Sequence, residues 1–70
     1  MKHIVLVRKF GGIINEVTYM LSKFDREVGD KMRIEGREYI VGCVGNSRNE
    51  VIDAINVKIK DQNKQLRGKY

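Results

Sequence analysis

The chain has 70 residues, a single cysteine, a single histidine and a formal net charge of +5. One cysteine excludes an intramolecular disulfide, and one His with one Cys cannot supply the four ligands of a structural zinc site. Sixteen isoleucine and valine residues, against one alanine and three leucines, favour strands over helices. Length and composition therefore predict one small basic domain that is rich in β-strand.

A first strand is predicted over residues 3–8, where apolar side chains form a short continuous run. The Gly11-Gly12 pair that follows it is a hairpin signal. Residues 13–24 are ambiguous, because their apolar side chains recur at helical spacing while the tight turn before them favours a returning strand. We expect a strand that ends at Met20, and we keep a helix over residues 13–24 as the alternative.

A central β-hairpin is predicted next. Its outgoing strand alternates apolar and charged side chains, which is the period of a half-buried strand. A type II′ turn on Gly36-Arg37 would place Ile34 opposite Tyr39 and keep the apolar side chains on one face. A turn one residue earlier, on Glu35-Gly36, would pair Ile34 with Arg37 and is the second choice.

The return strand of this hairpin, residues 39–44, is a continuous apolar run. Such a run predicts burial on both faces and a central position in the sheet. Gly42 within the run predicts a β-bulge or a tight bend. Polar loops are expected on both sides of the hairpin, over residues 22–30 and 45–49.

The C-terminal third supports two interpretations. Ile55, Val57 and Ile59 alternate with polar residues, as in a strand with a cationic outer face. Ser47 and Glu50, however, have the spacing of a capping box, and apolar residues after them also recur at helical spacing. The β-branched content of the segment favours the strand, so a helix that begins at Ser47 is the second interpretation.

Five short strands in up-and-down order predict a mainly β domain over residues 1–61 that closes into a small antiparallel barrel of SH3-like type. A polar tail over residues 62–70, expected to be frayed, would follow it. The alternative fold is α+β, with the helix over residues 13–24 on an antiparallel sheet. The segment from Gly29 to Tyr39 resembles the hairpins of SH3-like and nucleic-acid-binding barrels.

No set of residues predicts catalysis, a cofactor site or a metal site. General acid–base and nucleophilic catalysis need a positioned pair or triad of side chains. His3 and Cys43 both lie in predicted strands. We expect His3 to be a strand residue near solvent and Cys43 to be a small residue of the core. Gly11-Gly12 lacks the Gly-Lys-Ser/Thr that would follow in a phosphate-binding loop. We therefore expect that the protein is not an enzyme.

Basic residues form the candidate binding site. In the strand interpretation Lys58 and Lys60 share the outer face of the last strand, and Arg8 and Lys9 join them if that strand lies near the first. Such a stripe would bind phosphates, and an aromatic neighbour would stack on bases. The alternative role of such lysines is to deter edge-to-edge aggregation of the sheet. The candidate set is Arg8, Lys9, Phe10, Lys58, Lys60, Lys64 and Arg67.

We expect a non-catalytic binding or regulatory protein that engages nucleic acid through this stripe. One alternative is a small regulator, of the kind that viruses make, that inhibits a larger host protein through an acidic surface or by strand addition. Another is a binder of small anionic nucleotides that acts as a homodimer. No apolar run is long enough for a membrane span or a signal peptide, and a free Cys43 fits a reducing compartment, so we expect a cytoplasmic location.

Overall fold

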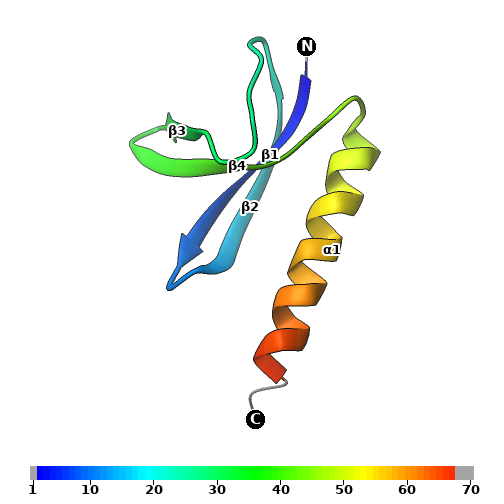
Figure 1. Cartoon of the computed structure of the whole chain (residues 1–70). Helices are drawn as coiled ribbons and strands as arrows, with labels where there is room; N and C mark the ends of the chain where they lie inside the picture. Colours follow the sequence, from blue (N-terminus) through cyan, green and yellow to red (C-terminus); the bar gives the residue numbers. More distant parts are fainter. Residues whose placement is uncertain (1, 68–70) are drawn as a thin grey trace.

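Four strands and one helix make up the part of the chain that the computed structural model describes, residues 2–67, with side chains as far as Gln65. The strands form one antiparallel sheet in the order β2-β1-β4-β3, so the first strand lies inside the sheet (Figure 1). The helix packs on one face of the sheet, mainly against β4 and β1. In chain order the elements are β1 (Lys2–Phe10), β2 (Ile13–Ser22), β3 (Lys31–Ile34), β4 (Arg37–Gly45) and α1 (Arg48–Arg67).

The sheet is not closed into the predicted barrel, because β2 and β3 are its two edges and the predicted fifth strand is part of helix α1. The helix begins where the capping box indicated. The Ser47 hydroxyl accepts a hydrogen bond from the Glu50 N–H at 3.2 Å, and the Glu50 carboxylate accepts one from the Asn46 N–H at 3.0 Å. Residues 62–67, predicted as a frayed tail, continue this helix, and residues 68–70 lie outside the described part.

Helical spacing decides which apolar residues of α1 reach the sheet. Val51 and Ile55, one turn apart, are buried, whereas Val57 is 58% exposed. The strand interpretation had grouped Ile55 with Val57 on one face. It was wrong because the capping residues and the 3.6-residue period outweighed the low helix propensity of β-branched side chains.

Residues Ile13–Ser22 form strand β2, so the strand interpretation is correct there and the alternative helix over residues 13–24 is wrong. Gly11 and Gly12 have φ angles of 59° and 79°, and Phe10 pairs directly with Ile13. Positive φ at both central residues is the geometry of the two-residue hairpin turn whose twist matches that of paired strands. Because of this turn, the segment that follows pairs antiparallel with β1.

The β3–β4 hairpin turns on Glu35 and Gly36, the second choice from the sequence, and the predicted turn on Gly36-Arg37 is wrong. Both turn residues have positive φ, 51° for Glu35 and 78° for Gly36, as a type I′ turn requires. Ile34 therefore pairs with Arg37, and Arg33 pairs with Glu38. This register sets opposite charges across the ladder, where the predicted one would have set two glutamates.

Gly42 forms a bulge in β4, as the sequence predicted. The register of β4 against β1 runs Val5 with Cys43 and then Leu6 with Val41, which leaves Gly42 as the extra residue. A Cβ atom on Gly42 would lie 2.9 Å from Val7 Cγ1, so the close packing of β1 needs glycine here. A bulge bends its strand and increases the local twist.

Each face of the sheet carries its own buried cluster. On the face that α1 covers, which we call the helix face, the cluster is Val5, Val7, Cys43, Val51 and Ile55. On the other side, which we call the opposite face, it is Ile4, Leu6, Tyr39 and Val41. Met20 of edge strand β2 and Met32 of edge strand β3 both pack against the second cluster and line one cavity. The edges of the sheet therefore curl toward one another over the opposite face.

A candidate anion-binding groove between β1 and β4

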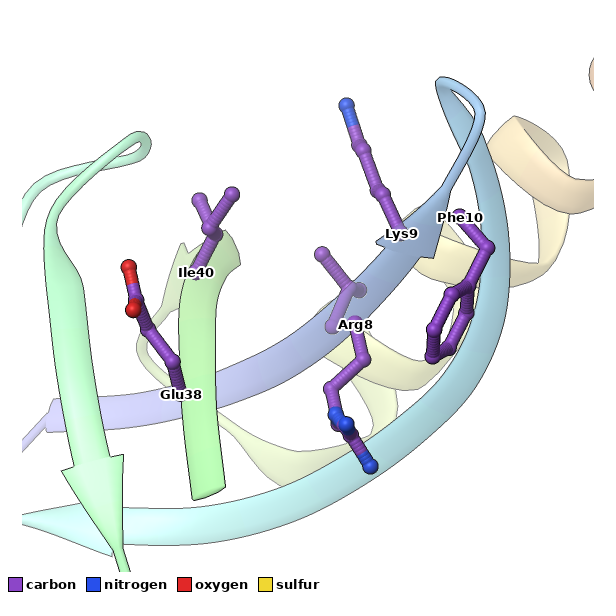
Figure 2. Close-up of a pocket in the computed structure, with 6 residues that line it drawn as sticks. Arg8, Lys9, Phe10, Glu38 and Ile40 are labelled. Carbon is purple, nitrogen blue, oxygen red and sulfur yellow. The ribbon is translucent and has the colours of Figure 1, made fainter. Parts of the chain in front are cut away.

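Strands β1 and β4 diverge at one end of the sheet. Their pairing ends at Val7 with Ile40, although β1 continues to Phe10 and β4 begins at Arg37. The separated ends enclose a cavity of about 220 Å³ (Figure 2). Its lining residues are Val7, Arg8, Lys9, Phe10, Glu38 and Ile40.

A second cavity, of about 130 Å³, adjoins the first between the sheet and helix α1. The two cavities share Val7, Lys9 and Ile40, and we call them together the β1–β4 groove. The second cavity brings Lys58 of α1 to the same groove. The floor is apolar and cations stand at the walls, so the groove suits a partner with both anionic and flat apolar parts.

Arg8 is held in place by three neighbours. One guanidinium nitrogen lies 3.2 Å from a carboxylate oxygen of Glu16 on β2. The guanidinium carbon lies 5.5 Å from the centre of the Phe10 ring and 5.9 Å from that of Tyr39. The Glu16 carboxylate offsets much of the positive charge of Arg8. The Arg8 guanidinium therefore orients the Phe10 and Tyr39 rings as well as supplying charge.

Lys9 and Phe10 are both exposed at the end of β1 that borders the groove. Lys9 points to the side of β1 opposite to Arg8, as alternation along a strand requires (Figure 2). Among the described side chains Lys9 forms no salt bridge, and it lines both cavities. Phe10 is 57% exposed at the end of β1, just before the glycine turn.

Of the candidate residues on the helix, only Lys58 belongs to the groove. Its ammonium group donates a hydrogen bond to the Gly42 carbonyl at 2.7 Å, which ties α1 to the bulge. Lys60 lies about 200° around the helix from Lys58, so the predicted shared face is wrong. Lys60 and Lys64 are exposed outside the two cavities, and the side chain of Arg67 lies outside those described.

Sequence reasoning did not find Glu38 and Val28, which also line the groove. Val28 belongs to the loop before β3 and reaches the groove because Gly29 and Asp30 hydrogen-bond to Val41 on β4. Glu38 reaches the groove because it lies two residues before Ile40, on the same side of β4, where β4 separates from β1. Neither position carries a local sequence signal, because both depend on how distant strands pair.

Other chemically reactive side chains of the described residues lie outside the groove. Within residues 2–67 no three His, Cys, Asp or Glu side chains come together as metal ligands. The lone histidine, His3, contacts the Tyr19 hydroxyl at 2.6 Å, and the guanidinium of Arg48 lies 5.5 Å from the Tyr19 ring. These contacts join the start of β1 to β2 and α1. No helix among residues 2–67 has the length and apolar character needed to cross a membrane.

Comparison with known proteins gives no relative. No protein-family model, no curated protein sequence and no solved structure matches the chain.

Proposed function

We propose that the protein is a non-catalytic binding protein that holds single-stranded nucleic acid in the β1–β4 groove. The observation that carries the proposal is the Phe10 ring, 57% exposed beside Arg8 and Lys9 at the groove. Exposed aromatic rings next to cations hold unpaired bases and phosphates with little regard to sequence. A duplex offers no free base face for such a ring.

Charge divides the groove into two sides. Lys9 and Lys58 stand toward the helix face, whereas Glu38 lines the wall formed by β4. A phosphate would be attracted by the lysines and repelled by the Glu38 carboxylate. The phosphate chain is therefore expected along the lysine side, with one base stacked on Phe10. The net charge of +5 would favour the encounter with a polyanion.

The test is a titration of labelled single-stranded DNA and RNA, and of their duplexes, at two salt concentrations. Replacing Phe10→Ala should weaken single-strand binding by about 1–3 kcal/mol through the lost stacking. Replacing Lys9→Gln should reduce the slope of log affinity against log salt by ~0.7, the value for one phosphate contact on a single strand.

The matched control is Lys60→Gln, which removes the same charge from an exposed position of α1 outside the groove. It should leave both affinity and salt slope nearly unchanged. Absence of binding at low salt would reject the proposal. Equal effects of Lys9→Gln and Lys60→Gln would also reject the groove, because they would indicate attraction by overall charge alone.

The second candidate function is regulation of a larger protein by binding an acidic extended segment in the same groove. The observation in its favour is that β1 and β4 separate after Val7 and Ile40, so that each presents backbone toward the gap. A strand inserted there would find hydrogen-bond partners on both sides. Stoichiometric capture of one acidic protein at moderate salt, lost in Lys9→Gln and kept in Lys60→Gln, would favour this function.

A further inference from the structure

The two edges of the sheet are built differently. β3 is four residues long and carries Lys31 and Arg33. Short length and cations are devices that stop an edge strand from pairing with another chain. β2 is ten residues long, and its one charged residue, Glu16, is paired with Arg8 at 3.2 Å. The register of β2 against β1 skips Asn15, so β2 has a bulge there, but the segment that follows it lacks both devices that protect edge β3.

The backbone groups that β2 offers to solvent follow from the ladder. Val41 bonds toward the β3 side through both its N–H and its C=O. Because successive residues alternate, Ile40 directs its groups to β1, and its partner Val7 directs its own to β4. Val7 also faces Val17 of β2, whose groups must then point away from β1. The outward-pointing residues of β2 are Val17, Tyr19 and Leu21.

This edge is complementary to itself. With a two-fold axis at Tyr19, Val17 would face Leu21 of the partner subunit, and the two tyrosines would face each other. Val17 and Leu21 are 43% and 46% exposed, so each would gain an apolar neighbour. On the other side of the ladder Thr18 would face Met20 of the partner subunit. No two like charges of β2 face each other in this register, because its one charged residue, Glu16, would face Ser22 of the partner subunit.

Gln62 of α1 fixes where such pairing must stop. Its side-chain amide accepts from the Ile14 N–H at 2.8 Å and donates to the Ile14 carbonyl at 3.2 Å. The amide thus occupies the outward backbone groups of Ile14 as a neighbouring strand would. The open part of the edge is the segment from Val17 to Leu21, whose centre is Tyr19.

We propose that two copies of this chain associate by antiparallel pairing of β2 with β2 about a two-fold axis at Tyr19. The two sheets then form one continuous sheet. The occupant is a second copy because the open segment fits its own sequence, apolar against apolar, and because it is neutral in a chain with a net charge of +5. This contact uses none of the groove residues, so its test is independent of nucleic-acid binding.

Sedimentation equilibrium over micromolar to millimolar concentrations tests the association. The wild type should approach twice the monomer mass of 8.1 kDa. Leu21→Lys should weaken the dimer at least tenfold, because it sets a charge against the apolar Val17 of the partner subunit. Val57→Lys, at a 58% exposed apolar position of α1, makes the same change elsewhere and should leave the dimer intact. A wild type that stays monomeric throughout, or equal weakening by both variants, overturns the proposal.

A disulfide experiment tests the register. Facing residues of a hydrogen-bonded antiparallel pair have Cα atoms about 5.5 Å apart, which a disulfide can span. Under mild oxidation an equimolar mixture of Val17→Cys and Leu21→Cys proteins should form a covalent dimer. Each variant alone should remain uncrosslinked, and the native Cys43 is buried. Crosslinking of either variant alone as readily as the mixture refutes the two-fold axis at Tyr19.

Discussion

The side chains at the centre of the helix face and of the opposite face are buried to the same degree, but different elements cover them. On the helix face, Val5 and Val7 lie beneath Val51 and Ile55 of α1. On the opposite face, Leu6 is 0% exposed with no helix above it among residues 2–67. Its cover comes from the curled edges of the sheet. A single sheet of this size can therefore supply two layers of core when it bends strongly enough.

Truncation of one buried side chain on each face gives the largest expected effect and tests whether both clusters are true cores. Leu6→Ala and Ile55→Ala should each lower the free energy of unfolding by about 2–5 kcal/mol, measured by urea denaturation. Both side chains are fully buried, at 0% and 2% exposure. A loss below about 1 kcal/mol for Leu6→Ala alone would mean that the opposite face packs loosely.

A side chain at the bulge should strain the helix face only. In Gly42→Ala the new Cβ would lie 2.9 Å from Val7 Cγ1, and this overpacking should cost about 1–3 kcal/mol. Combining it with Val7→Ala removes the clashing atom. Denaturation of the double variant should then show a loss smaller than the sum of the two single losses. Simple additivity would indicate that the backbone, rather than Val7, resists the substitution.

Weakening the start of α1 has the smallest expected effect and separates the two faces most sharply. Ser47→Ala removes the acceptor of the Glu50 N–H and should cost about 1 kcal/mol. Cys43 lies on the helix face, so local opening of α1 should raise the rate at which its thiol is labelled roughly fivefold. Asn49→Ala, at an exposed position in the first turn of the helix, is the control and should leave the rate unchanged.

Local sequence signals predicted the parts of the fold that local physics decides. The Gly11-Gly12 turn and the Gly42 bulge follow from backbone freedom at single positions, and both are present. The helix was ranked second because the segment from Val51 to Ile59 is rich in β-branched residues, although such residues also suit a helix that contacts the sheet through only some of them. The hairpin register was predicted wrongly because Glu35 adopts a positive φ of 51°. Positive φ is uncommon for a residue other than glycine, so the sequence gives no signal for it.

Some residues of the candidate groove were predicted from the sequence. The predicted reason for their proximity, a last strand beside the first, is wrong because that segment is helix α1. Arg8, Lys9 and Phe10 are neighbours in the chain, so their grouping needed no tertiary information. Lys58 joins them through the helix rather than through a strand, and Lys60 and Lys64 do not. Glu38 and Val28 could not be found from the sequence, because only the pairing of distant strands brings them to the groove.

The central place of β1 also affects how the chain folds while it is being synthesised. β2 follows β1 directly, so their hairpin can form as soon as both have left the ribosome. The other side of β1, with the apolar run Ile4–Val7, stays unpaired until β4 emerges at Arg37–Gly45. At typical synthesis rates that delay is on the order of seconds. During this interval an apolar strand edge is open to any other nascent chain, so the efficiency of folding depends on how quickly the second hairpin closes it.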